Sequence, residues 1–263
     1  MGGNLQSHKE IMQDKTLIQE QFGKNAQAYV DSKVHKLGAS LARLVELTRP
    51  QADWRVLDIA TAVGHTAFAF APHVAQVIAT DITPEMLALA KQETAVRNLT
   101  NITVEFADAE NLPYANAVFD LVTCRIAPHH FGDIPAFLRE TARVLRPGGL
   151  LALVDNVVPS GYAGDYVNAF EKLRDPSHGR CLTLTEWREA FAAAGLTVTH
   201  AETLDKQMNF EFWAKRHDMV MQRYLRTMLL HTPDGAHAFL QPQKTEEGIT
   251  FRLREGIVVG IRD

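Results

Sequence analysis

Three aspartates stand where the sequence predicts the carboxyl ends of successive buried strands, a place where carboxylates can bind a ligand. Asp58 lies in the first of these strands, Asp81 ends the second and Asp108 follows the third. A carboxylate at a strand end can accept hydrogen bonds from both hydroxyls of a ribose, which a single neutral acceptor matches less well. Each aspartate alone is typical of a cap or a turn, but three at successive strand ends favour a nucleoside site.

The loop after the first strand has the layout of a cofactor loop but few glycines. The stretch RVLDIATAVGHTAFAFAP, residues 55–72, predicts a strand, a tight loop and a helix, and the loop has Ala60, Ala62 and Val63 before Gly64. Glycine permits positive φ, so a Cβ at Ala62 would cost about 1 kcal/mol if the left-handed conformation is required. A β-branched residue at positive φ would be an outlier, so we expect Val63 to be extended or helical and Gly64 to take any unusual conformation.

Two adjacent histidines, His129 and His130, follow the predicted fourth strand and are the best candidates for a general base. A neutral imidazole can take a proton from a hydroxyl or from an acidic ring carbon. One histidine of such a pair must point away from the site, and a histidine in a loop after a strand is as often structural. Weaker candidates are His35, His65 and His178, the last in the polar turn RDPSH, which could cover a pocket.

The composition of the chain excludes several classes of protein. With 263 residues, 46% hydrophobic and 22% charged, and a formal net charge of -4, the chain is expected to be globular with one main domain and to lack a nucleic-acid surface. Cys124 and Cys181 lie far apart without zinc-ligand spacing, which predicts reduced thiols in a cytoplasmic protein and no metal site. The N-terminus has no apolar signal core, and we expect no transmembrane segment.

The elements that must position these residues follow an α/β pattern from about residue 55 to residue 158. Apolar runs alternate with helical stretches, which predicts a doubly wound parallel sheet covered by helices. The expected strands are residues 55–60, 77–81, 102–106, 119–125 and 150–156. Thr83, Pro84 and Glu85 predict the start of a helix after the second strand, and Asp133 is expected to cap a later one.

The two ends of the chain are less patterned. The first 50 residues predict helices, either a lid or a plain packing helix, and residues 51–158 the ligand-binding core. Residues 159–263 are expected to complete the same domain, with a substrate-side insertion over the carboxyl edge of the sheet and C-terminal strands. The last stretch, ITFRLREGIVVGIRD, predicts two strands around Glu255-Gly256 that close the sheet with an antiparallel edge.

Five segments in order resemble the class I methyltransferases that use S-adenosylmethionine: VLDIATAVGHT, ATDITPEML, FADAENLPYANAVFDLV, CRIAPHHF and VLRPGGLLALVD. The resemblance covers residues 18–205 and is closest to the small-molecule branch similar to the ubiquinone/menaquinone C-methyltransferases. It implies a Rossmann-like, doubly wound, mostly parallel seven-stranded sheet with helices on both faces and an antiparallel C-terminal edge strand. S-adenosylmethionine would be the cofactor and S-adenosylhomocysteine its product.

By this resemblance the ends of four strands would contact the cofactor. The loop after the first strand would face the methionine portion, the second strand end the ribose and the adenine face, the third the adenine edge, and the fourth the amino-acid end. The implied residues are Asp58, Ala60, Thr61, Ala62, Gly64 and His65, then Asp81, Ile82 and Met86, then Asp108 and Ala109, and finally Arg125 and Ile126. Relatives tend to have glycine where this chain has Ala62, a departure that raises the question of a weakened loop.

The sequence therefore predicts methyl transfer to a small, partly apolar molecule by in-line displacement, in which alignment and exclusion of water matter most. His130 and His129 are the candidate catalytic residues, and the protein is expected to be a monomer or a homodimer. A noncatalytic protein that binds S-adenosylmethionine stays open because of Ala62 and Val63. A nicotinamide-dependent oxidoreductase is disfavoured, because residues 58–64 do not spell G-x-G-x-x-G.

Overall fold

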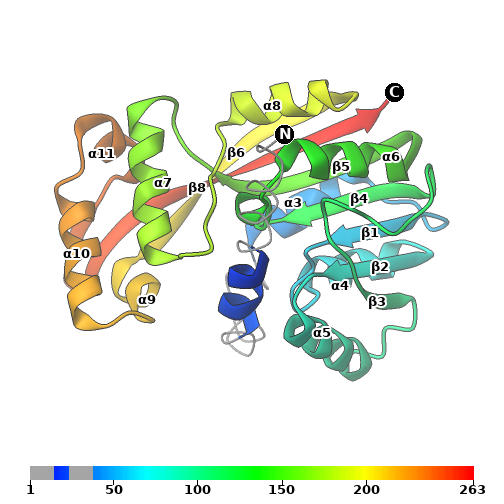
Figure 1. Cartoon of the computed structure of the whole chain (residues 1–263), viewed down its shortest axis with the longest axis horizontal. Coiled ribbons are helices and arrows are strands. Elements are labelled where there is room, and N and C mark those ends of the chain that lie inside the picture. Colours follow the sequence, from blue (N-terminus) through cyan, green and yellow to red (C-terminus); the bar gives the residue numbers. More distant parts are fainter. Residues whose placement is uncertain (1–14, 24–37) are drawn as a thin grey trace, which may run out of the picture.

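A mixed sheet with helices on both faces forms the frame of the molecule in the computed structural model, which describes residues 15–23 and 38–263 (Figure 1). The strands are β1 (Arg55–Ile59), β2 (Gln76–Asp81), β3 (Ile102–Phe106), β4 (Phe119–Arg125), β5 (Leu145–Val157), β6 (Leu196–Asn209), β7 (Gln243–Thr245) and β8 (Gly248–Arg262). Their order is β3-β2-β1-β4-β5-β8-β6, with the short β7 paired to β8. Strands β1 to β5 are parallel, and the order reverses between β1 and β4, where such sheets bind ligands.

The expected fold class is confirmed, and the five predicted parallel strands match β1 to β5 apart from small differences at the ends. The C-terminal strand is antiparallel as expected, but two details were wrong. It is one continuous strand, and it lies between β5 and β6 instead of at the edge. Gly256 lies within this strand and does not mark a turn. A Cβ at this position would lie 2.5 Å from a methyl carbon of Val157, so glycine is needed for close packing.

Helices follow most of the strands of the sheet. They are α3 (Ala39–Thr48), α4 (His65–Phe70), α5 (Pro84–Val96), α6 (Ile134–Val144), α7 (Tyr162–Arg174), α8 (Leu184–Ala193), α9 (Phe210–Ala214), α10 (Met219–Leu230) and α11 (Asp234–Leu240), with 3-10 turns at Ala71–His73 and Pro128–His130. Residues 15–23 are also helical. Asp133 caps α6 as predicted, accepting from the amide of Ala136, whereas Thr83 occupies the N-cap of α5 without a capping hydrogen bond from its side chain.

Two apolar cores lie on opposite faces of the sheet because alternate strand residues point to opposite sides. On one face Leu57 belongs to a cluster with Phe137 of α6 and Trp187 of α8. On the other face Val56 belongs to a cluster that includes Phe70 of α4. The sheet is thus held rigidly between helices, so the carboxyl ends of its parallel strands are fixed in place.

A C-terminal lobe, made of α7, α9, α10, α11 and β7, lies beside these carboxyl ends (Figure 1). The strands β6 and β8 pair from Leu196 to Asn209 and extend beyond the parallel strands to carry it. The lobe has its own core, in which Phe170 stacks on Trp213 with ring centroids 4.7 Å apart. Among the described residues, none of the helices is long and apolar enough to cross a membrane.

Candidate functional site

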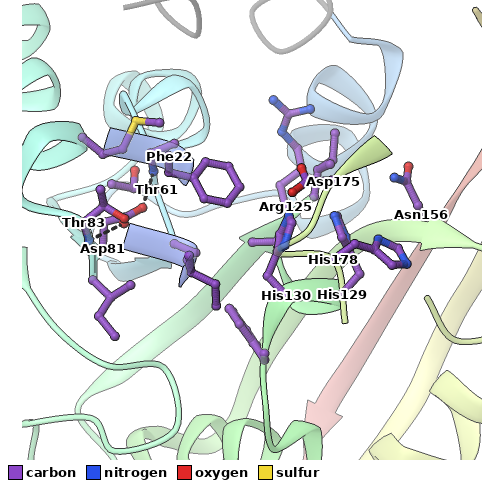
Figure 2. A pocket seen from close by; sticks show the side chains of 18 of the residues that line it. Phe22, Thr61, Asp81, Thr83, Arg125, His129, His130, Asn156, Asp175 and His178 are labelled. Atoms are coloured by element: carbon purple, nitrogen blue, oxygen red, sulfur yellow. Dashed lines mark hydrogen bonds between the residues drawn. The ribbon is translucent and has the colours of Figure 1, made fainter. Parts of the chain in front are cut away.

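A cavity of about 720 Å³ lies between the carboxyl ends of the parallel strands, the helical residues 15–23 and the C-terminal lobe. We call the part lined by residues 15–23 and by the ends of β1, β2 and β3 the loop side. We call the part lined by the end of β5 and by α7, α9 and β6 the lobe side. In Figure 2 Thr61 and Asp81 mark the loop side, Asn156 and His178 the lobe side, and Arg125 and His130 lie between them.

In the loop between β1 and α4, every second residue from Ala60 to Gly64 has a left-handed backbone conformation. Ala60, Ala62 and Gly64 have φ of 52°, 50° and 99°, and Val63 is not among the residues with positive φ. The predictions for Val63 and Gly64 are confirmed, but the two alanines are left-handed as well. Val63 is buried, 1% exposed, in a small cluster with Met86, so its side chain fixes the loop against α5.

Asp81 lies at the end of β2 with both carboxylate oxygens aimed by backbone amides (Figure 2). Its Oδ2 accepts from the amide of Ala62 and its Oδ1 from the amide of Thr83, each at 2.9 Å. Burial raises the pKa of Asp81, and these amide hydrogen bonds counteract part of that rise. Asp81 also lines the cavity, so its carboxylate can accept from two adjacent hydroxyls there.

Asp58 and Gly64 belong to the predicted ligand-contacting set, but neither lines the cavity. The hydroxyls of Thr61 and Thr123 donate to the two carboxylate oxygens of Asp58 at 2.6 and 2.7 Å. Burial raises the pKa of Asp58 to about 6. Asp58 therefore fixes the loop through Thr61. Gly64 is the N-cap residue of α4, where a Cβ would lie 2.5 Å from the ring of Phe68. Both are positioning residues.

The helical residues 15–23 cross the loop side and pair with the third strand end. Lys15 Nζ lies 2.7 Å from both Asp108 Oδ2 and Glu110 Oε2, and the Gln19 side-chain amide donates to the Ile82 carbonyl at 2.7 Å. Lys15 also lines the cavity, together with Ile18 and Phe22 of the same helix. Of the predicted N-terminal lid, residues 1–14 and 24–37 lie outside the described residues, as does His35, and residues 39–48 form α3, which does not line the cavity.

Arg125 at the end of β4 and the adjacent Ile126 line the cavity between its two sides. Arg125 Nε donates to the Thr66 hydroxyl at 3.3 Å, and burial lowers the pKa of its guanidinium. The remaining predicted residues that line the cavity are Ala60, Thr61, Ala62, His65, Asp81, Ile82, Met86, Asp108 and Ala109. The loop side therefore gathers nearly all of the residues expected to contact one ligand.

The histidines after β4 are buried at the boundary of the two sides and have different partners. His129 Nδ1 lies 2.5 Å from Asp155 Oδ1. Burial lowers the pKa of His129 to about 4 and raises that of Asp155 to about 8, so this pair holds one shared proton without net charge. His130 Nδ1 donates to the Ser177 carbonyl at 3.0 Å, which leaves its Nε2 as an unprotonated acceptor.

The lobe side contains polar groups that the sequence did not single out as ligand contacts. Asn156 ends β5, Glu171 lies on α7 and Lys206 on β6, and all three line the cavity. The turn with Asp175 and His178, which the sequence suggested as a cover, also lines it. The strand-end rule could have indicated Asn156, but nothing in the sequence marked Glu171 or Lys206. Among the residues that the structure describes, no cluster of histidine, cysteine and acidic side chains could hold a metal ion.

Known methyltransferases are similar to this chain in sequence and in fold. The family described as methyltransferase domain matches residues 57–153. The uncharacterised methyltransferase YcgJ of Bacillus subtilis is 35% identical over 246 residues, covering 92% of this chain and 97% of that protein. The crystal structure of YcgJ has a TM-score of 0.81 at 33% identity and covers 85% of this chain and 97% of its own.

The names of two further relatives state the molecule that is methylated. The demethylmenaquinone methyltransferase of Deinococcus radiodurans is 41% identical over 109 residues, covering 40% of this chain and 44% of that protein. The 27-O-demethylrifamycin SV methyltransferase of Amycolatopsis mediterranei is 30% identical over 208 residues, covering 76% of each. The first of these matches covers less than half of either protein.

Proposed function

The chain belongs to the class I methyltransferases, and we propose that it transfers the methyl group of S-adenosylmethionine to a small, partly apolar molecule by in-line displacement. The observation that carries the proposal is the Asp81 carboxylate, which lines the cavity and whose two oxygens are aimed by the amides of Ala62 and Thr83. This geometry suits the two hydroxyls of a ribose. When bound, S-adenosylmethionine supplies a methyl group activated by the positive charge of its sulfonium.

The loop side fits the other parts of this cofactor. Ile82 and Met86 offer an apolar surface for an adenine face, and Asp108 with Ala109 can accept hydrogen bonds at its edge. The left-handed loop from Ala60 to His65 would hold the methionine portion, and Arg125 with Ile126 its amino-acid end. The cofactor carries no pyrophosphate, so the alanine methyl groups that replace glycines in this loop are tolerable.

The histidines lie where an acceptor must meet the cofactor, between the loop side and the lobe side. His130 presents the lone pair of Nε2, and burial lowers its pKa to about 3, so it stays unprotonated at neutral pH. Burial favours the neutral form of the nearby Asp175, but Ser177 and Arg216 donate to this carboxyl and lower its pKa, so it remains ionised. A base of so low a pKa takes the proton as the acceptor atom bonds to the methyl carbon, when that proton becomes strongly acidic, and the Asp175 carboxylate would stabilise the imidazolium.

His129 has a second role in this proposal. Its Nδ1 is bound to Asp155, which fixes the orientation of the ring at the boundary of the two sides. The ring centroids of His129 and His130 are 4.1 Å apart, so His129 also holds its neighbour in place. The lobe and the helical residues 15–23 line two sides of the cavity, where they would limit the access of water to the reacting groups.

A small acceptor suits the size and the lining of the cavity. Its volume of about 720 Å³ is within the range of small-molecule pockets. The lobe side combines apolar residues, such as Met208, Trp213 and Leu253, with charged ones. The names of the two relatives with printed acceptors, a menaquinone precursor and a rifamycin, are consistent with a small molecule.

Calorimetry tests this proposal directly on the whole protein. We expect S-adenosylmethionine and S-adenosylhomocysteine to bind at least about tenfold more tightly than NAD or ATP, because Asp81 recognises the ribose and the loop side offers no phosphate cradle. The absence of heat with both sulfur nucleosides would contradict the proposal. Tighter binding of NAD would revive the oxidoreductase.

A further inference from the structure

Four large apolar side chains are exposed on α9 and α10, which lie next to each other in the C-terminal lobe (Figure 1). Phe212 of α9 is 61% exposed, and on α10 the exposed fractions of Met219, Val220 and Tyr224 are 84%, 64% and 63%. They are half of the large apolar side chains that the described residues expose. Such a concentration marks an interaction surface, and we call these four residues the α9–α10 face.

The exposed residues of α10 lie on one side of this helix. Met219 and Arg223 are four residues apart, as are Val220 and Tyr224, so the two pairs form adjacent rows on the helix surface. Leu225 on the opposite side is fully buried in the core of the lobe. A helix that packs by one side and exposes apolar and basic residues on the other is typical of proteins that lie on the surface of a membrane.

Basic residues accompany the α9–α10 face. The segment of residues 212–226 contains one acidic residue but four basic ones, Lys215, Arg216, Arg223 and Arg226, although the formal net charge of the whole chain is -4. Arg216 pairs with Asp175 and Arg226 with Glu211. Lys215 and Arg223 are exposed and have no acidic partner among the described residues, so their charges can attract an anionic surface.

The α9–α10 face reaches the opening of the cavity. Phe212 and Lys215 both line the cavity and are both exposed, so they lie where the cavity meets solvent. Lys215 Nζ lies 4.0 Å from the centre of the Phe212 ring, which places an apolar and a cationic group together at this opening. An apolar molecule can therefore pass beside Phe212 between the cavity and whatever the face contacts.

We propose that the α9–α10 face docks on the surface of a membrane that contains anionic lipids. Its apolar side chains lie at the level of the headgroups and the first acyl carbons, and Lys215 and Arg223 contact the lipid phosphates. A second copy of this chain is a poorer partner, because it would bring the same cations face to face. The proposal goes beyond methyl transfer, since it states from where an apolar acceptor enters the cavity.

Co-sedimentation of the whole protein with lipid vesicles tests this proposal. We expect vesicles of phosphatidylcholine with about 30% phosphatidylglycerol to bind the protein at least about tenfold more tightly than vesicles of phosphatidylcholine alone, because two cations face the anionic surface. Equal binding to the two kinds of vesicle, or no binding to either, would overturn the proposal. So would a dimer, seen by analytical ultracentrifugation without lipid, that Val220→Asp dissociates, because a second copy would then cover the face.

Two valines of similar exposure separate docking from a general effect of added charge. Val220 is 64% exposed, and Val96 at the end of α5, away from the lobe, is 69% exposed (Figure 1). Val220→Asp should weaken binding to the anionic vesicles at least about tenfold, whereas Val96→Asp should change it less than about twofold. Aspartate is favourable in the first turn of a helix, so Val220→Asp is expected to fold. Equal binding by these two variants would overturn the proposal.

Two arginines test the contribution of charge in the same way. Arg223→Gln should bind the anionic vesicles about fivefold more weakly, whereas Arg139→Gln, which changes an exposed arginine of α6, should bind like the wild type. If these two variants bound equally, Arg223 would not face the membrane and the proposal would be wrong. None of the four substituted residues lines the cavity, so the affinity for S-adenosylhomocysteine should stay unchanged. Failure of S-adenosylhomocysteine to bind the wild type would instead refute the methyltransferase function.

Discussion

The two sides of the cavity differ in how their polar groups are satisfied. On the loop side, Asp81 and Asp108 already accept hydrogen bonds from backbone amides, and Lys15 pairs with Asp108. On the lobe side, Glu171 and Asn156 keep buried oxygens without partners. The carboxylates of the loop side therefore have fixed partners, while the lobe side keeps two buried oxygens without one.

This difference follows from what each side is made of. The loop side consists of strand ends and a loop whose backbone is fixed by the sheet, so its geometry depends little on individual side chains. The lobe side adds to β5 and β6 the side chains of α7 and α9, two helices that are not part of the sheet. A shared cofactor suits the first kind of site, and an acceptor particular to this protein suits the second.

The largest effect that would test this comparison is expected from Asp81→Ala. The change removes a charge-assisted contact to two hydroxyls and should weaken S-adenosylhomocysteine binding by about 2 kcal/mol, or about 30-fold. Calorimetry measures the affinity, and circular dichroism should show an intact fold.

A matched control for this change is Asp120→Ala. Asp120 is also a buried strand aspartate that accepts from a backbone amide, that of Arg55, but it does not line the cavity. Its loss should lower stability and leave the affinity unchanged. If both variants bound S-adenosylhomocysteine equally well, the ribose would have to lie elsewhere.

The sequence predicted the loop side well because strand ends carry a local signal. Asp81 and Asp108 follow apolar runs, and the register of parallel strands brings their ends together at one edge. The lobe side has no such signal, because the placement of Glu171 depends on how α7 packs against α10 and α11. The strand β8 was misjudged for a similar reason, since the close approach of Val157 to Gly256 is visible only in three dimensions.

The next effect in size is a pH dependence of stability arising from His130. Its pKa is about 3 in the folded protein, lowered by burial and by His129, against about 6.5 in the unfolded chain. Between these values only the unfolded chain takes up the proton, so stability is lost as the pH falls through about 6.5. Between pH 7.5 and 5.5 the wild type should lose about 1 kcal/mol more than His130→Asn.

Urea unfolding at the two pH values measures this difference. His129 and His178, whose pKa values burial also lowers, contribute to both proteins and therefore cancel in the comparison. A parallel loss of stability in the wild type and His130→Asn would mean that His130 has an ordinary pKa. Burial at the boundary of the two sides would then affect this histidine less than the structure indicates.

The smallest effect is expected from Ala62→Gly, which asks whether the loop is a working cofactor site or a weakened one. Ala62 has φ of 50°, a conformation that glycine adopts without strain. Relief of that strain should raise the free energy of unfolding by up to about 1 kcal/mol, but glycine also gives the unfolded chain more freedom, which offsets part of the gain. Calorimetry should therefore show S-adenosylhomocysteine affinity unchanged or improved by less than about tenfold.

The same substitution at Ala67 provides the control. Ala67 is buried in α4, where glycine should lower the free energy of unfolding by about 1 kcal/mol, because a helix demands no positive φ. The amide of Ala62 donates to Asp81 whichever residue stands there, so the contact that aims the carboxylate survives the change. If Ala62→Gly tightened binding by a hundredfold, the methyl group would be blocking the cofactor and the loop would be a weakened one in the natural protein. An affinity within tenfold means that the backbone, and not the missing glycine, sets the geometry of this loop.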